Sequence, residues 1–315
     1  MIYTERLLLE YILSVVLNYF NMDVIWLENS KVIQWFPGHM AKAKREIIES
    51  LNKVDIVFEL YDARIPFSSK NPMVDEIVKN KPRLVLLNKS SIADKKTTKL
   101  WIDYYKNKGI LALDIDSING YNINKIVDYS KIALKETYEK REKKGIKSKQ
   151  IKALIIGIPN VGKSTLINKL AKRKATNVGD KPGVTKAQSW IKVSDDLFLL
   201  DTPGVLWPKF EDQMVGLRLA ICGSIKDDIL DKIDISLGAI ELIKARYPEM
   251  LKERYKLDNL ESNEEILNNI AKNRGCLLKG GEPDLLRCAT LLLNDIRNIR
   301  IGAMSYEEPN WFKFI

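Results

Sequence analysis

The sequence has little histidine and cysteine and no long apolar run. Among 315 residues there is one histidine, and the three cysteines stand far apart at Cys222, Cys276 and Cys288. They form no zinc-binding pattern with that histidine. An odd, sparse cysteine count also fits a reducing compartment better than a disulfide framework. We therefore interpret all three thiols as packing residues.

The apolar stretch at residues 7–20 does not indicate a membrane protein. It is too short to span a bilayer, and Glu10 and Asn18 interrupt it. It also lacks a lysine-rich flank and a small-residue cleavage site, so a signal peptide is not indicated. We interpret residues 1–31 as an extension outside the core. It is either a loosely attached amphipathic helix or the result of a start assigned too early, and we favour the second, with the natural start near Val32.

The charge of the chain is unbalanced. The 51 lysines and arginines exceed the 41 acidic residues, which gives a formal net charge of +10. A basic surface favours a polyanionic partner, with RNA ahead of DNA, although simple solubility would also explain it. A hydrophobic content of 45% is ordinary for a globular protein, and the length allows two domains.

A glycine-rich loop follows the apolar strand predicted at residues 153–156 and precedes a predicted helix. It matches G-x-x-x-x-G-K-[ST], the phosphate-binding P-loop. Gly157 and Gly162 permit a backbone path that turns successive N–H groups inward around phosphate oxygens. Lys163 is expected to reach the β- and γ-phosphates, and the Ser164 hydroxyl to ligate Mg²⁺. The sequence therefore predicts a nucleoside triphosphate site.

Two later segments have the pattern of γ-phosphate switches. Thr185 matches the switch I threonine, which ligates Mg²⁺ in the triphosphate state. Asp201 and Gly204 belong to a D-x-x-G motif, in which the aspartate holds the magnesium shell and the glycine N–H senses the γ-phosphate. A kinase would need an acceptor site rather than two such sensors, so the pair favours a GTPase.

Two earlier segments have the pattern of a base-binding site. Asn88 and Lys89 match the first half of N-K-x-D, and Asp116 and Ser117 lie where a second base-contacting loop is expected. Ser91 stands where the guanine-reading aspartate is expected. A serine hydroxyl makes fewer hydrogen bonds than a carboxylate and carries no charge. We still favour GTP, with reduced discrimination against other bases.

The residue that orients the attacking water is not evident. Val205 follows the glycine of D-x-x-G, where many GTPases place a glutamine, and valine cannot hydrogen-bond water. His39 is a candidate because a neutral imidazole can accept a hydrogen bond from water. The alternative, equally open, is that His39 caps the helix expected at 41–52 or contacts RNA. Intrinsic turnover is expected to be slow.

Strands alternating with helices predict an α/β fold with a mostly parallel sheet of about six strands. A hairpin of residues 189–193 and 197–200 is expected to add an antiparallel edge. The base-recognition half precedes the phosphate-binding half, as in a circularly permuted Ras-like P-loop GTPase sheet. Both halves can still meet at the carboxyl ends of the strands.

After residue 225 helical periodicity replaces the strand pattern, which predicts a small all-α domain. In its helix opened by Pro283 and Asp284, we expect Arg287, Arg297 and Arg300 to face solvent or RNA. The predicted units are the extension at 1–31, a permuted GTPase domain at 32–225 and a helical, RNA-contacting domain at 226–315. Within the GTPase domain we expect a base-recognition half at 32–134, a charged linker at 135–150 and a P-loop and switch half at 151–225.

The candidate site residues fall into three groups. For the nucleotide they are Asn88, Lys89, Ser90, Ser91, Asp116, Ser117, Asn160, Val161, Gly162, Lys163, Ser164, Thr165 and Gly204; for Mg²⁺, Ser164, Thr185 and Asp201; and for catalysis, His39, Lys163 and Thr185.

With these motifs the chain resembles the circularly permuted ribosome-biogenesis GTPases of the YlqF (RbgA) family, over roughly residues 32–305. The stretches that carry the resemblance are residues 35–43 (Trp-Phe-Pro-Gly-His-Met-Ala-Lys-Ala), 62–66 (Asp-Ala-Arg-Ile-Pro), the P-loop, 182–185 (Pro-Gly-Val-Thr), 201–204 (Asp-Thr-Pro-Gly), 219–225 and 274–276.

The resemblance implies a cytoplasmic GTPase that binds large ribosomal subunit precursors and rRNA and assists a late assembly step. It also implies slow turnover alone, ribosome stimulation, and potassium stimulation with Asn160 as the matching ligand. We expect a monomer that does not bind DNA. Two alternatives stay open: an RNA-binding scaffold with negligible hydrolysis, and a P-loop NTPase with relaxed base specificity.

Overall fold

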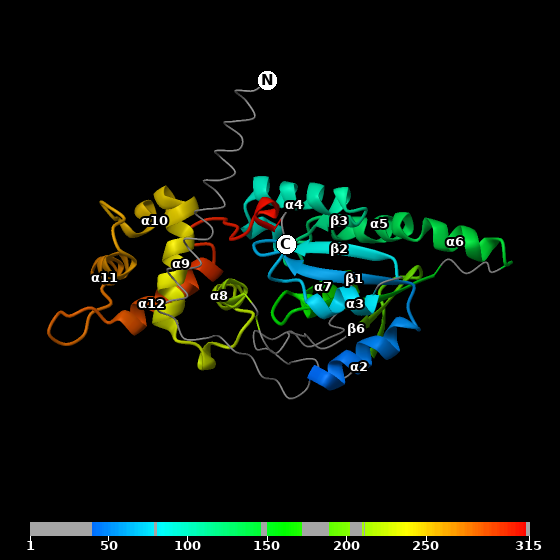
Figure 1. Ribbon diagram of the computed structural model, residues 1–315, viewed down its shortest axis with the longest axis horizontal. Coiled ribbons are helices and arrows are strands. Elements are labelled where there is room, and N and C mark those ends of the chain that lie inside the picture. Colours follow the sequence, from blue (N-terminus) through cyan, green and yellow to red (C-terminus); the bar gives the residue numbers. More distant parts are fainter. Residues whose placement is uncertain are drawn as a thin grey trace, which may run out of the picture.

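The computed structural model describes residues 40–78, 81–145, 150–171, 189–201, 210 and 212–312 (Figure 1). Within these residues a six-stranded sheet has the order β3-β2-β1-β4-β6-β5. Its pairs are parallel except β5 with β6, which is antiparallel. The predicted fold class is confirmed. The strands are β1 (Ile56–Asp62), β2 (Arg83–Asn88), β3 (Leu111–Asp114), β4 (Ile151–Gly157), β5 (Ser189–Lys192) and β6 (Leu197–Asp201).

The strand register brings the two halves of the chain together. β1 of the first half pairs directly with β4, the strand that leads into the P-loop. Leu60 lies opposite Gly157, and Asp62 lies opposite Asn88. Because these pairs are parallel, the carboxyl ends of β1, β2 and β4 finish at one edge of the sheet. This is the edge where α/β folds bind ligands.

Helices cover both faces of the sheet. Alternate residues of β1 point to opposite sides, with Val57 in one apolar cluster and Phe58 in another. The cluster around Val57 includes side chains of α2 and α3, whereas that around Phe58 includes side chains of α5 and α7. The helices of this part are α2 (Met40–Leu51), α3 (Pro72–Val78), α4 (Lys95–Asn107), α5 (Ile126–Ala133), α6 (Lys135–Glu142) and α7 (Lys163–Leu170).

The C-terminal region is helical, as predicted. α9 contacts the other four α-helices there, and α8 lies between the sheet and the remaining helices (Figure 1). None of the helices in the described part of the chain is both long and apolar enough to cross a bilayer. The helices are α8 (Gln213–Ile221), α9 (Lys232–Arg246), α10 (Pro248–Tyr255), α11 (Asn263–Asn273) and α12 (Leu285–Arg297).

Polar side chains set where several helices begin. A capping side chain accepts a hydrogen bond from a backbone N–H of the first turn, which has no acceptor within the helix. Asp284 does so for Arg287 N at 3.0 Å, so α12 begins where its Pro-Asp signal predicts. The corresponding caps elsewhere are Asp94 of α4, Asp212 of α8, Asp231 of α9 and Ser262 of α11.

The segment after α12 returns to the first half of the chain. Tyr306 N donates to the carbonyl of Arg64 at 2.8 Å, and the buried Glu307 carboxylate accepts from the backbone N–H of Phe67 at 2.7 Å. Trp101 Nε1 of α4 donates to the Glu307 carbonyl at 3.3 Å. The helical region is thus tied to the base-recognition half by its own C-terminal segment. The domain boundary at residue 225 stays a prediction.

Candidate functional site

The P-loop has the backbone shape that binds anions. It joins β4 to α7, with Asn160 at φ 56° and Gly162 at φ 100°, both in the left-handed region. Left-handed residues among right-handed ones turn successive N–H groups toward one side. Lys163 Nζ lies across the loop, where it donates to the carbonyls of Gly157 at 3.0 Å and Ile158 at 3.2 Å. The concave loop, its lysine and the N-terminus of α7 fit a chain of phosphates.

Two glycines of the loop are required by close approach. A Cβ at Gly157 would lie 2.6 Å from the carbonyl oxygen of Leu60 in β1. A Cβ at Gly162 would lie 2.4 Å from Nδ2 of Asn88. Both neighbours belong to the base-recognition half, so these glycines allow the two halves to approach closely at the site.

Asn88 joins three segments of the site through one buried amide. Its Nδ2 donates to the carbonyl of Val161 in the P-loop at 2.7 Å. Its Oδ1 accepts from the backbone N–H of Ser117 at 3.0 Å and from the Ser117 hydroxyl at 2.8 Å. The residue is only 1% exposed. The N-K motif, the loop after β3 and the P-loop therefore meet at one point.

A buried carboxylate holds the lysine of the N-K motif. Asp62, at the end of β1, accepts from Lys89 Nζ at 3.0 Å and from Arg64 Nε at 2.9 Å and Nη2 at 2.7 Å. Burial acts to raise the pKa of Asp62, but the charges and hydrogen bonds of Arg64 and Lys89 outweigh it and hold that pKa well below its ordinary value. The sequence pointed to Asp62 and Arg64 only through the family resemblance. Asp62 is the last residue of the strand and Arg64 follows two positions later, and polar residues at a strand end were the signal that could have placed them at the site.

The loop after β2 carries the remaining base-site candidates. Ser90 is buried, and its N–H donates to the carbonyl of Ile115 at 3.1 Å. Ser91 is exposed, and its hydroxyl donates to the carboxylate of Asp116. Asp94, the other acidic residue near Ser91, caps α4 instead, accepting from Thr97 N at 2.7 Å. Asp116 is therefore the carboxylate in contact with position 91.

The magnesium and switch candidates are only partly described. Ser164 and Thr165 lie in the first turn of α7. Asp201 ends β6, and its backbone lies opposite Ile155 of β4, beside the P-loop strand. Among the described residues no three acidic, histidine or cysteine side chains form a metal site by themselves. His39, Thr185, Gly204 and Val205 lie outside the described residues.

Three side chains from different segments meet the carboxyl end of α8. Asn160 Nδ2 of the P-loop donates to the carbonyl of Gly223 at 2.8 Å, and Arg64 Nη2 donates to that of Cys222 at 3.4 Å. Arg297 of α12 donates to the carbonyls of residues 221 and 220 at 3.1 and 2.8 Å. The expectation that Arg297 faces solvent or RNA is wrong, because a helix end offers it carbonyl acceptors. Arg300 faces solvent as expected: it contacts Asp295 at 3.2 Å, but its side chain is 60% exposed.

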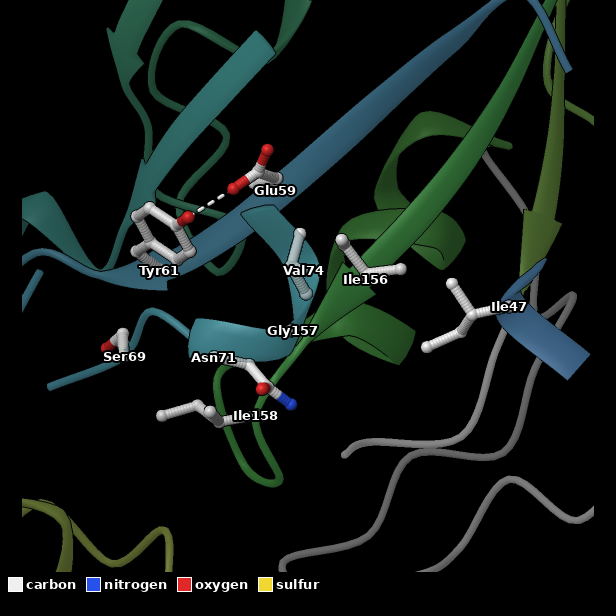
Figure 2. Close-up of a pocket in the computed structure, with 9 residues that line it drawn as sticks. All are labelled: Ile47, Glu59, Tyr61, Ser69, Asn71, Val74, Ile156, Gly157 and Ile158. Atoms are coloured by element: carbon white, nitrogen blue, oxygen red, sulfur yellow. Dashed lines mark hydrogen bonds between the residues drawn. The ribbon is translucent and has the colours of Figure 1, made fainter. Parts of the chain in front are cut away.

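A separate hollow lies on the other side of the first P-loop glycine. Figure 2 shows Ile47, Val74 and Ile156 facing it, with the hydrogen-bonded pair Glu59 and Tyr61 at one end. Its lining is mainly apolar and includes none of the side chains gathered around Asn88. Such a lining suits packing beneath α2 and α3 rather than a charged nucleotide.

Comparison with known proteins agrees with this geometry. Residues 152–272 match the family model described as 50S ribosome-binding GTPase. The ribosome biogenesis GTPase A of Bacillus cereus is 53% identical over 282 residues, which cover 89% of this chain and 95% of that protein. The chain belongs to the ribosome biogenesis GTPase A family. The member from Thermotoga maritima is 33% identical and spans 88% of this chain and 95% of its own.

Solved structures of this family have the same fold. GNP-bound YlqF from T. maritima matches with a TM-score of 0.59 and 29% identity, over 85% of this chain and 98% of that one. A GDP-bound YlqF structure matches with a TM-score of 0.61 and 28% identity, over 84% and 99%. This family member is therefore a GTPase that binds GTP, which confirms the predicted enzyme class and nucleotide.

Proposed function

We propose that this GTPase assists assembly of the large ribosomal subunit and that its affinity for the subunit precursor and rRNA changes with the γ-phosphate. The observation that carries the proposal is the meeting of the base-recognition half and the P-loop at Asn88. Relatives named ribosome biogenesis GTPase A support the assembly role. The protein would then work in the cytoplasm, where ribosomes are built, as a monomer.

Different residues around Asn88 bind the base and the phosphates. The base is surrounded by the two loops that Asn88 joins, through Asn88, Lys89, Ser91, Asp116 and Ser117. The phosphates lie against residues 160–165, where backbone N–H groups and the Lys163 ammonium neutralise their charge.

The metal assignments follow the donor chemistry. The Ser164 hydroxyl, with Asp201 and Thr185, supplies oxygen ligands of the kind that Mg²⁺ prefers. Bound Mg²⁺ would neutralise charge on the β- and γ-phosphates. Asn160 would offer K⁺ its amide oxygen while its amide nitrogen holds Gly223. His39 would orient the attacking water.

The contact between Asn160 and Gly223 suggests how nucleotide state reaches the helical region. The P-loop is tied by this contact to the end of α8, which α12 also contacts through Arg297. A change at the γ-phosphate would therefore alter the packing of α8 against residues 226–315. That region would present its basic side chains to rRNA.

The test is GTP turnover with and without purified large ribosomal subunits. We expect slow turnover alone, stimulation by the subunits, and loss of both in Lys163→Ala. Cosedimentation with large subunits on sucrose gradients should be stronger with a non-hydrolysable GTP analogue than with GDP. Turnover that stays at background with and without the subunits, and equally in Lys163→Ala, would contradict the proposal and favour a non-hydrolysing scaffold.

A further inference from the structure

The serine at position 91 of the base site is hydrogen-bonded to a second side chain. Its hydroxyl proton points to the carboxylate of Asp116, 25 positions further along the chain. Ser91 is exposed at the site, whereas Asp116 is 3% exposed. The hydroxyl oxygen therefore faces the site with a buried carboxylate directly behind it.

The orientation of this hydroxyl decides which base it can bind. A serine hydroxyl has one proton and two acceptor lone pairs. The Watson–Crick edge of guanine presents donors at N1 and at the 2-amino group, so its reader must accept hydrogen bonds. Adenine presents an acceptor at N1, and xanthine presents a carbonyl acceptor at C2. Because its proton is given to Asp116, Ser91 meets the base edge as an acceptor, which favours guanine.

Asp116 is fixed in this orientation by its own loop. Its Oδ1 accepts from the backbone N–H of Ile118 at 2.9 Å and of Asn119 at 3.1 Å. Its backbone N–H donates to the carbonyl of Tyr121 at 3.1 Å, and its carbonyl accepts from Gly120 N at 2.8 Å. The backbone bonds fix the loop, and the carboxylate cannot rotate away from Ser91 without losing the two bonds to its Oδ1. Its other oxygen, Oδ2, is thereby presented to position 91.

We propose that Ser91 and Asp116 together replace the single carboxylate that usually reads guanine. Ser91 is the residue that contacts the base, and Asp116 is a positioning residue that fixes the serine proton and places negative charge behind the hydroxyl oxygen. The inference rests on the proposed binding of GTP at this site. The pair of Ser91 and Asp116 restores the discrimination between guanine and other bases that a serine without Asp116 would lack.

Asp116→Asn separates this role from a structural one. The asparagine oxygen can keep the bonds to Ile118 and Asn119, while its NH₂ group donates to Ser91. The serine proton is then released toward the base. Loss of a charge-assisted hydrogen bond predicts GTP affinity lower by about 10- to 100-fold. XTP affinity should stay constant or rise, because xanthine can accept the released proton.

Adding Ser91→Asp to Asp116→Asn should rescue the preference for GTP. It moves the carboxylate to position 91 and leaves an amide donor behind it, so GTP preference should return. Ser91→Asp alone should bind GTP more weakly than this double variant, because two carboxylates then face each other. Glu264→Gln, in the exposed first turn of α11, is the matched charge control and should change no affinity.

The experiment is calorimetric titration of each variant with GDP, GTP, XTP and ATP, with circular dichroism to check folding. A fall in the GTP-to-XTP affinity ratio in Asp116→Asn, recovered in the double variant, is the expected result. Equal losses for all nucleotides in Asp116→Asn, or an unchanged GTP-to-XTP ratio, would overturn the inference without contradicting GTP binding by the wild-type protein. A wild-type protein that binds neither GDP nor GTP would instead refute the proposed function.

Discussion

At the scale of single residues, the carboxylate of Asp62 joins two cations of the base half. It is fully buried and binds two cations, Arg64 and Lys89. Removing one partner of a buried ion pair leaves the other charge unpaired in a poorly solvated place, which costs about 3–5 kcal/mol. Arg64 is itself buried, so it cannot turn to water when Asp62 is lost.

Asp62→Asn should therefore reduce the free energy of unfolding by about 3–5 kcal/mol and weaken GTP binding, because Lys89 loses its fixed position. Urea unfolding and GTP titration measure the two effects. Asp196→Asn is the control, since the Lys131–Asp196 pair is exposed and should be worth less than about 1 kcal/mol. Equal effects of the two substitutions would contradict the buried-pair account.

The ion pairs of Asp62 predict how protein stability depends on pH. Because the native pKa of Asp62 is lowered, its stabilising contribution is fully present above the unfolded pKa of about 3.9. It is lost only as pH falls below that value toward the native pKa. The stability difference between wild type and Asp62→Asn should thus be constant from pH 7 to about pH 5.

Gly162→Ala tests the close approach of the P-loop to Asn88. Alanine there would be strained at φ 100° and would place a Cβ 2.4 Å from Asn88. We expect GTP binding to be lost and stability to fall. Gly109 is the control, because it has φ 71° with no atom within 4 Å of the added Cβ. Gly109→Ala should cost about 1–2 kcal/mol of stability and leave GTP affinity unchanged.

At the scale of elements, the carboxyl end of α8 connects the P-loop, the base half and α12. Arg297 of α12 donates to two of its carbonyls and also pairs with Asp227, with both ion-pair contacts at 2.9 Å. The helix end is thus held by a side chain from a helix more than 70 positions away. Its loss should loosen α8 against α12 without disturbing the sheet.

Arg297→Gln should lower the free energy of unfolding by about 1.5–3 kcal/mol, the value of hydrogen bonds made by a charged group. Arg287→Gln, on the exposed first turn of the same helix, is the matched control and should stay within about 0.5 kcal/mol of wild type. Thermal unfolding measures both. If the proposed coupling is right, Arg297→Gln should also reduce ribosome stimulation while intrinsic turnover is retained.

These helices also show what sequence could and could not predict. The strands and helices followed from apolar periodicity and capping residues, which are local properties. Arg297 was placed in solvent because its partners belong to another helix. Ser91 was judged as a lone hydroxyl because Asp116 is brought to it only by the path of the loop after β3. Such pairings depend on tertiary structure and carry no local pattern.

At the scale of the molecule, motif order was enough to predict a permuted sheet, because each motif had to follow a strand end. The return of the C-terminal segment was not predictable. Glu307 accepts hydrogen bonds from Phe67 N and Ser68 N, about 240 positions earlier, and nothing near Glu307 in sequence marks it as buried. This contact joins the base half to the helical region independently of the P-loop.

The net charge of +10 makes a prediction about the whole protein. Binding to rRNA releases counterions, so the affinity for large ribosomal subunits should fall steeply with salt, by about 10-fold or more between 50 and 200 mM. Gradients in the presence of a GTP analogue, at matched concentrations of KCl and NaCl, measure this fall. The two salts should weaken subunit binding equally, because the effect depends on ionic strength. GTP turnover, in contrast, should be faster in KCl if Asn160 helps to bind K⁺. Subunit affinity that does not change with salt would show that the basic surface serves solubility alone.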